Sequence, residues 1–333
     1  MKISVFELEH WERSAFEALA QDHEVRFEEA PLDQELAEQH RDADVVSTFI
    51  YSDLGVRVLE TFESLQLVAT RSTGVDHIDA EWCADHGVTV CNVPTYGSAT
   101  VAEHVFALLL ALGHQVVEAV DRTRRGDFSH EGLRGFDLRG KTIGVIGTGE
   151  IGRHTIRIAN GFGMDVIAAD VEQDDDAAEQ LGFRYVDLEK LLAESDVVSL
   201  HVPGGEATRH MIGPDEFDRM KRGVVLINTS RGSVIDTGAL LRALSDGTVA
   251  AAGIDVIEEE PVVREEAELL HSLFNRRHDL ETLLADHILL RMRNVIITPH
   301  TAFNTTEAVE RILEITCENI AAHLEGERQN VIA

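Results

Sequence analysis

The stretch TIGVIGTGEIG, residues 142–152, decides the fold. Gly147, Gly149 and Gly152 stand in the spacing G-x-G-x-x-G, after the apolar run 143–146 and before a segment of helical periodicity. The spacing alone is weak, because the chain holds 25 glycines. A strand before it and a helix after it are typical of a dinucleotide-binding turn. There the first glycine permits a tight bend, the second lets a pyrophosphate approach the backbone, and the third lets helix and strand pack closely.

A second apolar run, 166–169, ends at Asp170, 18 residues after the last glycine of the turn. A carboxylate at this position can accept hydrogen bonds from the adenosine ribose, and its charge repels the extra phosphate of NADP. The backbone amides of Glu150 and Ile151 open the helix and can bind the pyrophosphate. The sequence therefore predicts NAD(H), favoured over NADP(H). The alternatives are that Asp170 only caps a strand end, and that Arg153 faces either phosphate or solvent.

Apolar runs of strand length alternate with helix-compatible stretches along nearly the whole chain. Such alternation predicts parallel sheets covered by helices. We expect an α/β protein with two Rossmann-like domains, each built on a doubly wound parallel sheet. The runs cover residues 3–6, 45–50, 67–70 and 88–93, and then 143–146, 166–169, 197–201, 224–228, 250–256 and 295–298.

The order of these runs predicts that one domain is inserted into the other. The amphipathic stretch 306–324 reads as one long helix, which we expect to return to the first domain. The substrate-binding (catalytic) domain then comprises residues 1–98 and 301–333, and the NAD-binding domain comprises 99–300. Thr100 and Glu103 have the spacing of a capping box, which predicts a long helix through about residue 120. The charged segment 263–293 is expected to hold one or two short helices.

Charge excludes nucleic acid as a partner. The chain has 60 acidic and 29 basic residues, a formal net charge of −31, and phosphate backbones are bound mainly by lysine and arginine. Only four of the basic residues are lysines. This balance suggests a salt-rich cytoplasm, where screening weakens self-repulsion. The alternative is an acidic protein from an ordinary cell.

Membrane insertion, secretion and metal binding are not expected. The longest apolar run, 105–112, is far shorter than the roughly 20 residues that span a bilayer. Acidic residues arrive before any signal-like segment develops, so we expect a cytoplasmic protein. Cys83, Cys91 and Cys317 are odd in number and not closely paired, which predicts reduced thiols and no metal site.

Three further motifs follow strands of the second domain: NTSRG at 228–232, GIDVIEEEP at 253–261 and TPHTA at 298–302. With RSTGVD at 71–76 and NVP at 92–94, they make the chain resemble the D-isomer-specific 2-hydroxyacid dehydrogenase family over essentially its whole length. The segment PHTAF and the insertion after residue 260 look most like the D-lactate dehydrogenase branch. The resemblance implies reversible hydride transfer between NADH and a small, pyruvate-like 2-keto acid.

The resemblance also implies a catalytic triad. Arg231 is expected to bind the substrate carboxylate, because a guanidinium matches it at two points. His300 is expected to give its proton to the reacting carbonyl oxygen and to remove it in the reverse direction. Glu260 is expected to orient His300 and favour its protonated form. Glu258 and Glu259 are competing candidates, but the register from the preceding aspartate favours Glu260.

Supporting roles are implied in the same way. In the substrate domain, backbone amides of Thr73 and Gly74 are expected to bind the substrate carboxylate, while Tyr96 and segment 49–51, with Tyr51, border the substrate. Phe303 is expected beside the substrate side chain. Core packing is the alternative for Tyr51 and Phe303. Val202 and Pro203 are expected to contact the adenosine side of the cofactor. Thr229 and Ser230 are expected on the nicotinamide side, and Asp255 is expected to bind the nicotinamide amide.

The family also implies a homodimer, formed through the helix near 100–120 with the apolar face 105–112 buried against a second subunit. From the residues alone, burial of this helix within one chain is the alternative. A rival interpretation is an NAD-sensing interaction protein, because transcriptional corepressors share this fold and triad. The chain carries no appended tails or basic patches, which favours the enzyme.

Overall fold

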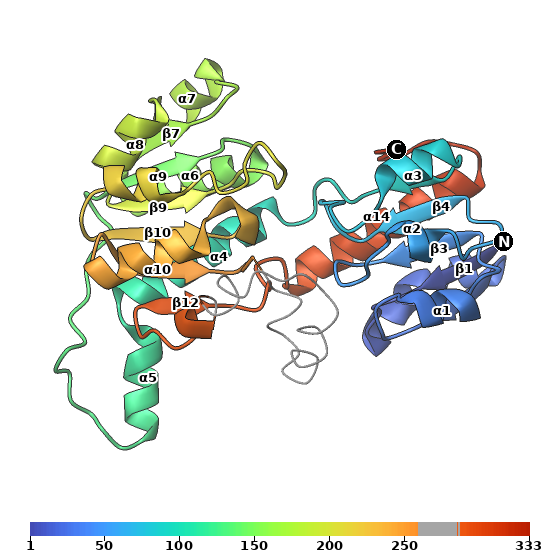
Figure 1. The fold of residues 1–333 in the computed structure, drawn as a ribbon, viewed down its shortest axis with the longest axis horizontal. Coiled ribbons are helices and arrows are strands. Elements are labelled where there is room, and N and C mark those ends of the chain that lie inside the picture. Colours follow the sequence, from blue (N-terminus) through green and yellow to red (C-terminus); the bar gives the residue numbers. More distant parts are fainter. Residues whose placement is uncertain (259–284, 286) are drawn as a thin grey trace. The chain divides into compact units, whose positions relative to one another are not determined.

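The computed structural model describes residues 1–258, 285 and 287–333 (Figure 1). The chain divides into two compact units: Met1–Gly97 with Asn304–Ala333, and Ser98–Phe303. Each unit holds one parallel sheet with helices, so the predicted fold class is confirmed. The short helices expected within 263–293 fall mostly outside the described residues.

The first unit contains a five-stranded parallel sheet in the order β2-β1-β3-β4-β5. All four predicted strands form, and the strand Glu24–Phe27 was missed. Its charged side chains at positions 24 and 26 hide the apolar pattern, because β2 lies at the sheet edge and is only partly buried. The strands are β1 (Lys2–Val5), β2 (Glu24–Phe27), β3 (Val45–Thr48), β4 (Leu67–Thr70) and β5 (Thr89–Cys91).

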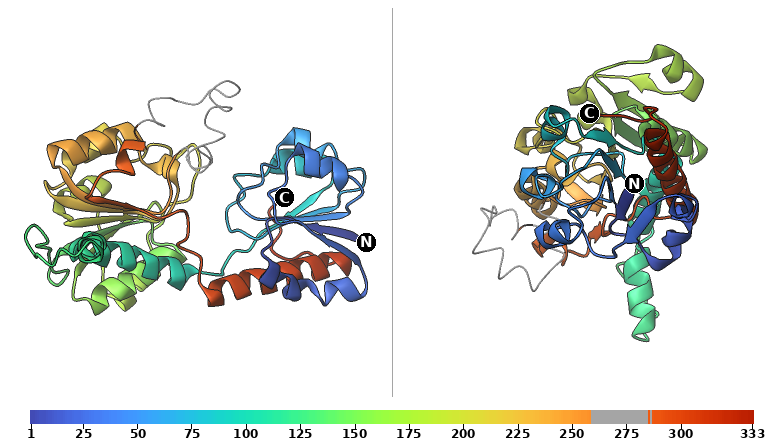
Figure 2. Two further views of the ribbon diagram at one scale, coloured as in Figure 1. Left: turned by 90° about the horizontal axis from the view of Figure 1, so that it is seen from below. Right: turned by 90° about the vertical axis from the view of Figure 1, so that its right-hand side faces the viewer.

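Helices cover both faces of this sheet. The predicted helix at 306–324 is confirmed as α14 (Thr306–Leu324), whose first turn is capped by the Thr305 hydroxyl accepting from the Ala308 amide. It packs against β4 and the 3-10 helix η1 (His10–Phe16) and follows one face of the sheet (Figure 2). A buried core joins the sheet to the remaining helices, α1 (Gln34–Gln39), α2 (Val56–Leu59) and α3 (Ala80–Asp85). A short 3-10 helix, η2 (Leu19–Gln21), precedes β2.

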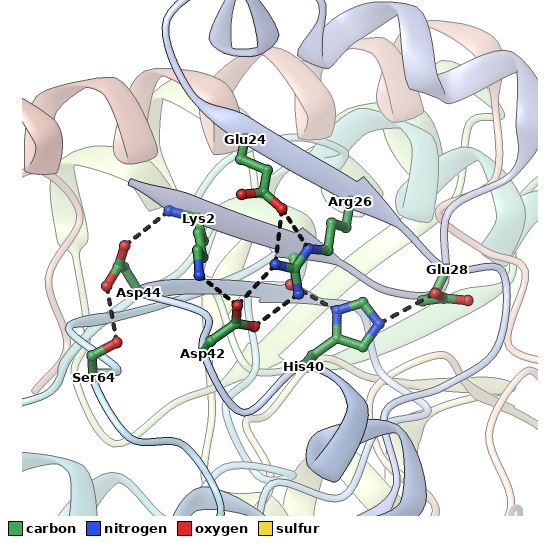
Figure 3. A network of polar contacts seen from close by, with 9 residues as sticks. Lys2, Glu24, Arg26, Glu28, His40, Asp42, Asp44 and Ser64 are labelled. Atoms are coloured by element: carbon green, nitrogen blue, oxygen red, sulfur yellow. Dashed lines mark hydrogen bonds and ion pairs between the residues drawn. The ribbon is translucent and has the colours of Figure 1, made fainter.

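An ion-pair network joins the amino-terminal ends of β1 and β3 (Figure 3). Asp42 receives hydrogen bonds from Arg26 at 2.8 Å and from Lys2 at 2.6 Å. These two cations hold the pKa of the Asp42 carboxyl below its usual range. Beside them, Asp44 accepts from the Lys2 amide at 2.8 Å and from the Ser64 hydroxyl at 3.0 Å. The charged side chains at the amino-terminal edge of this sheet are therefore paired with one another within the unit.

The second unit contains a seven-stranded parallel sheet in the order β12-β11-β10-β9-β6-β7-β8. All six predicted strands form, and β8 was missed because it has only two residues. The strands are β6 (Thr142–Ile146), β7 (Asp165–Ala169), β8 (Arg184–Tyr185), β9 (Val197–Leu200), β10 (Val224–Asn228), β11 (Val249–Ile254) and β12 (Val295–Ile297).

Two buried clusters lie on opposite faces of this sheet, as doubly wound topology requires. One cluster includes side chains of three helices: α8 (Leu188–Glu194), α9 (Pro214–Arg219) and α10 (Thr237–Asp246). The other includes side chains of α4 (Ser98–Gly113) and α6 (Glu150–Gly161), with Leu181 of α7 (Asp175–Leu181) against it.

The single long helix expected from Thr100 to about residue 120 is wrong. Helix α4 begins at Ser98, so Thr100 lies inside its first turn and is buried, and α5 (Val116–Arg124) follows after a break. The carbonyl of Gly113 accepts a hydrogen bond from the Phe136 amide at 2.9 Å, and Gln115 takes a φ of +52°. The two helices are consequently bent by 60°.

For most of the apolar face 105–112, the structure supports the alternative, burial within one chain. Val105, Leu108, Leu109 and Leu112 pack into the core of their own unit. They contact the sheet face that α6 also covers. The apolar residues that α5 leaves exposed are instead Val116, Val117 and Val120.

In the described part of the chain, no single helix is long and apolar enough to cross a membrane, and only the bent α4–α5 pair meets that test by length and composition. Among the same residues, no group of three or more His, Cys, Asp or Glu side chains could hold a metal ion. Cys83, Cys91 and Cys317 are free, as expected. Burial raises the pKa of each thiol to about 11.

Candidate cofactor and active site

The glycine turn joins β6 to α6, and two of its glycines are required by the chain itself. Gly147 has a φ of +95°, and a Cβ there would lie 2.5 Å from the His201 carbonyl oxygen. A Cβ on Gly152 would lie 2.1 Å from the carbonyl oxygen of Gly147. Both contacts are too short for any side chain, so these positions permit only glycine.

Gly149 differs from its two neighbours. Among the described residues, no atom lies within 4 Å of the place where its Cβ would stand, and its φ of −66° is open to any residue. It is the N-cap of α6, and no side chain of the described residues caps the helix there. The first amides of α6, from Glu150 and Ile151, therefore adjoin a space that suits an anion. A pyrophosphate fits this cradle.

Asp170 follows β7 and braces the glycine turn. Its Oδ2 atom accepts from the Thr148 amide at 2.6 Å and from the Thr148 hydroxyl at 2.8 Å, and Oδ1 accepts from the Glu172 amide at 3.1 Å. Partial burial raises the pKa of Asp170, but the hydrogen bonds from Thr148 and Glu172 outweigh it and leave the pKa lowered. The carboxylate thus caps the strand end, and it carries its charge near neutral pH.

The Arg153 side chain is bonded to other residues of the chain. Its Nε atom donates to the Thr148 carbonyl at 2.8 Å, and one terminal nitrogen pairs with Asp174 at 2.9 Å. After β9, Val202 packs against the core while Pro203 is exposed. The next residue, Gly204, lies so near Arg231 that a Cβ on it would be 2.9 Å from the Arg231 Cγ atom.

Arg231 lies in a tightly bonded loop after β10. Asn228, the last residue of that strand, accepts at Oδ1 from the Ser230 amide and hydroxyl at 3.0 and 2.7 Å, and donates to the Arg231 carbonyl at 2.9 Å. A Cβ on Gly232 would lie 2.2 Å from the Ile257 carbonyl, which fixes the far side of the loop. Asn228 was not predicted to have a role. The only sign of one in the sequence is an amide side chain at the end of an apolar strand.

The hydroxyls of Thr229 and Ser230 differ. That of Ser230 is used within the loop, whereas the buried Thr229 Oγ1 atom has no hydrogen-bond partner among the residues described. Buried polar atoms are nearly always bonded in folded proteins. A ligand with a polar group is the kind of partner that would satisfy Thr229, the residue predicted to lie on the nicotinamide side.

His300 lies in a loop that is organised by Asp255. The Asp255 carboxylate, 1% exposed, accepts from the Thr298 hydroxyl and from the amides of Thr301 and Ala302, both at 2.9 Å. The His300 amide donates to the Asp255 carbonyl at 2.9 Å. His300 also has a φ of +52°, a conformation that non-glycine residues seldom adopt and that is often found at functional sites.

A second histidine reaches this loop from α4. The His104 Nε2 atom lies 3.0 Å from the Thr298 hydroxyl and 3.5 Å from the Asp255 carboxylate. His104 was not predicted from the sequence, because nothing in a helical segment marks a partner 194 residues away. Asp255 was predicted to bind the nicotinamide amide. The bonds that the structure gives its carboxylate go to the 298–302 loop and α4.

Of the three glutamates at 258–260, the structure describes only Glu258. One Glu258 oxygen accepts from Arg209 at 2.8 Å and from His210 at 2.9 Å, and its side chain is 8% exposed. The described bonds of Glu258 therefore go to residues 209 and 210. Glu260, the predicted partner of His300, lies outside the described residues.

The predicted substrate residues of the first unit follow its strands. Thr73 donates from its hydroxyl to the Val93 carbonyl at 2.7 Å, and the Gly74 carbonyl accepts from Ser72 at 2.7 Å. The Tyr96 carbonyl accepts from Arg311 of α14 at 2.6 Å. Tyr51 is 45% exposed, so core packing does not explain it. Phe303 is the final residue of the second unit and is half-buried.

Within the second unit, the predicted residues share one edge of the sheet. The glycine turn, Asp170, Val202, Arg231, Asp255 and His300 each follow a strand end, and the strands are parallel neighbours. Ligands of open α/β sheets bind at this carboxyl edge. This edge therefore carries the glycine turn, a cation and an imidazole.

Comparison with known families agrees. The family model described as D-isomer specific 2-hydroxyacid dehydrogenase, NAD binding domain, matches residues 106–302. The chain belongs to the D-isomer-specific 2-hydroxyacid dehydrogenase family. The match confirms the resemblance drawn from the motifs, and it makes the protein an NAD-dependent oxidoreductase of this family.

Relatives within the 2-hydroxyacid dehydrogenases cover nearly the whole chain. Glyoxylate reductase of Korarchaeum cryptofilum is 38% identical over 304 residues, covering 90% of this chain and 85% of the relative. D-lactate dehydrogenase of Escherichia coli is 34% identical over 336 residues, covering 98% of both chains. The crystal structure of D-lactate dehydrogenase from Aquifex aeolicus complexed with NAD and lactic acid matches with a TM-score of 0.85 at 34% identity, covering 98% of this chain and 96% of that one.

Proposed function

We propose that this dehydrogenase reduces a small 2-keto acid of the pyruvate type to the D-2-hydroxy acid with NADH, and catalyses the reverse reaction. The observation that carries the proposal is the histidine loop. Asp255 holds residues 298–302 in a conformation that gives His300 a positive φ, at the sheet edge that also bears Arg231 and the glycine turn.

Arg231 is proposed to bind the substrate carboxylate and polarise the carbonyl. A guanidinium is permanently charged and binds a carboxylate through two parallel hydrogen bonds. Its backbone is set by Asn228, and its side chain lies against Gly204. Such fixed placement lowers the entropy that the residue loses when substrate binds.

His300 is proposed as the acid and base. It would donate a proton to the carbonyl oxygen during reduction and recover it during oxidation, which suits an imidazole near neutral pH. Glu260 is proposed to orient the ring and favour its charged form. Loss of the proton donor should slow turnover more than it weakens binding.

Bound NAD(H) supplies or accepts the hydride. We propose that the α6 amides of Glu150 and Ile151 hold its pyrophosphate above Gly149, and that Asp170 accepts from the adenosine ribose. The negative charge of Asp170 would disfavour the extra phosphate of NADP(H). Val202 and Pro203 are proposed on the adenosine side, with Thr229, Ser230 and Asp255 on the nicotinamide side.

Thr73 and Gly74 are proposed to offer amides to the substrate carboxylate, with Tyr51, Tyr96 and Phe303 near its side chain. Glyoxylate is the second candidate substrate, because relatives at 38% identity are named glyoxylate reductases. Apolar pockets separate such acids by only about 1 to 3 kcal/mol per methylene. Kinetics with a graded series of 2-keto acids and both reduced cofactors would decide between them.

Two substitutions test the chemistry. His300→Ala should lower kcat by about 10²- to 10⁴-fold with little change in KM. Arg231→Ala should lower kcat and also raise KM, because it removes substrate binding. Arg184→Ala, which removes an exposed arginine of the same unit paired with Glu194, is the control and should retain activity. Near-normal pyruvate reduction by both test variants would reject the assignment.

A homodimer, a cytoplasmic location and a salt-rich habitat remain proposals. With face 105–112 buried in its own core, the surface proposed for the dimer is α5 with its exposed Val116, Val117 and Val120. A monodisperse monomer at high salt would contradict it. The rival NAD-sensing role predicts no turnover on any 2-keto acid together with NADH-dependent capture of a partner protein.

A further inference from the structure

One carboxylate holds the loop of residues 49–52, which carries Tyr51. Glu7 follows β1, and its Oε1 atom accepts from the amides of Phe49 at 3.1 Å and Ser52 at 3.0 Å. Its Oε2 atom accepts from the Tyr51 amide at 2.9 Å. The Ser52 hydroxyl donates to Oε1 as well. Four donors of one loop thus converge on a single side chain.

Glu7 is itself held in an unusual conformation. Its φ is +54°, in the left-handed region that few non-glycine residues adopt. The buried side chain of Arg71, the first residue after β4, donates to the carbonyls of Phe6 and Glu7, both at 2.7 Å, and to the Ser47 hydroxyl at 3.3 Å. The turn after β1 is therefore held by the side chain of Arg71, which follows β4.

The two charges of this cluster depend on each other. Burial lowers the pKa of Arg71, and the nearby Glu7 carboxylate acts in the opposite direction. A buried cation without a counter-charge is strongly unfavourable. Arg71 opens the segment that continues to Thr73 and Gly74, so the cluster joins three loops at the carboxyl edge of the sheet.

We infer that Glu7 is a positioning residue for the substrate, which acts by holding the 49–52 loop so that Tyr51 meets the side chain of the 2-keto acid. The inference rests on the proposed function, since it takes Tyr51 as a substrate residue. The Tyr51 ring is half exposed and has an edge contact with Phe49 at 6.1 Å between centroids. Its backbone amide is bound by Glu7, so the place of the ring depends on the conformation of the loop.

A carboxylate is needed here, and an amide cannot replace it. Both oxygens of Glu7 accept hydrogen bonds from N–H groups. Glutamine has only one acceptor oxygen, and its NH₂ group would face either the Tyr51 amide or those of Phe49 and Ser52. At least one loop amide then loses its partner, and the loop should leave its present conformation.

The test is Glu7→Gln with Asp44→Asn as its matched control. Asp44 precedes β3 at the opposite edge of the same sheet and also accepts from a backbone amide and a serine hydroxyl (Figure 3). Glu7→Gln should raise the KM for 2-keto acids by about tenfold or more, since bonds to charged groups are the strong ones. The kcat value should stay within about twofold, and the Kd for NADH should not change. Asp44→Asn should leave all three unchanged.

Two further readouts complete the experiment. Glu7→Gln should narrow the preference between pyruvate and larger 2-keto acids, which a purely structural role would not do. Hydrogen exchange of the 49–52 amides, measured without substrate, should be faster by about tenfold or more in Glu7→Gln but not in Asp44→Asn. If Glu7→Gln does not fold, Glu7→Asp keeps the charge opposite Arg71, but it is one methylene shorter and should give the same KM rise.

The outcomes separate this inference from the proposed function. A wild type without turnover on any 2-keto acid would defeat the proposed function. An active wild type, matched by Glu7→Asp and by any folded Glu7→Gln in KM, substrate preference and loop exchange, would overturn this inference alone.

Discussion

The backbone of His300 is bonded to Asp255: the His300 amide donates to the Asp255 carbonyl at 2.9 Å. The Asp255 carboxylate then accepts from the amides of the next two residues, Thr301 and Ala302. One buried aspartate on β11's end thus determines the course of the loop that follows β12. The proposed acid and base therefore depends on a residue 45 positions earlier in the chain.

Replacing Asp255 should reduce both catalysis and stability. In Asp255→Asn one oxygen becomes NH₂, which cannot accept from the Thr301 and Ala302 amides at the same time. We expect unfolding to be easier by about 1 to 3 kcal/mol and kcat to fall about 100-fold as His300 loses its alignment. Steady-state kinetics and denaturant unfolding measure both effects.

Asp187→Ala is the control for that experiment. It removes the N-cap of α8 in the same unit and should cost about 1 kcal/mol of stability without lowering kcat. An Asp255→Asn enzyme as active as this control would contradict the proposed arrangement.

The glycines of the turn should respond differently to alanine. Gly152→Ala places a Cβ 2.1 Å from the Gly147 carbonyl oxygen and should destabilise the second unit by several kcal/mol, on the order of the larger core substitutions. Gly149→Ala meets no atom of the described chain within 4 Å, and as a poorer N-cap of α6 it should lower the thermal midpoint much less than Gly152→Ala does. Its Kd for NADH should rise, because the methyl group occupies the proposed pyrophosphate space. Unchanged NADH binding in Gly149→Ala would argue against that placement.

Acid should destabilise the second unit through His201. Burial lowers the pKa of His201 from 6.5 to about 4. Between pH 6.5 and pH 4, the imidazole is therefore protonated in the unfolded chain but neutral in the folded chain. Stability from the neutral ring is complete above pH 6.5 and is lost as the pH falls towards 4, by up to about 3 kcal/mol. His201→Gln should flatten this part of the stability profile. A wild type whose unfolding free energy does not change between pH 6.5 and 4 would contradict a neutral, partly buried His201.

Salt should stabilise the protein. With a net charge of −31, self-repulsion is strong in dilute buffer and is screened over about 10 Å at 0.1 M salt and about 3 Å at 1 M. We expect the thermal midpoint to rise steadily from 0.05 M to 2 M KCl. Equal midpoints across this range would remove the proposal of a salt-rich habitat and leave an acidic protein of an ordinary cell.

Local pattern was enough to predict most of the architecture. The apolar runs located all strands except β2, whose charged residues reflect its edge position, and β8, which has two residues. The α4–α5 break was missed because its cause, the Phe136 amide on the Gly113 carbonyl, comes from 23 residues further along the chain.

In the site, too, local features could be predicted from the sequence and contacts between distant segments could not. Its glycine turn could be predicted from the glycine spacing between a strand and a helix. Two of the glycines, Gly147 and Gly152, also meet a steric demand from the end of a neighbouring strand or from the turn itself. His104 and the anchoring role of Asp255 could not, because their hydrogen bonds join distant segments and no spacing rule marks them. The hydrogen bonds of Asn228 are local, to Ser230 and Arg231, but no motif rule assigns them. The contribution of Glu7 is of this kind too, since its partners lie more than 40 residues away.

The interrupted first unit has a consequence for biosynthesis. Helix α14 packs on β4, and the amide of Val90 donates to the carbonyl of Ala333. All five strands of the first sheet are therefore made early, but they lack the α14 cover until residues 304–333 leave the ribosome. The nucleotide unit, residues 98–303, is continuous, so we expect it to complete its core before the first unit does, against the usual order in which amino-terminal domains mature first.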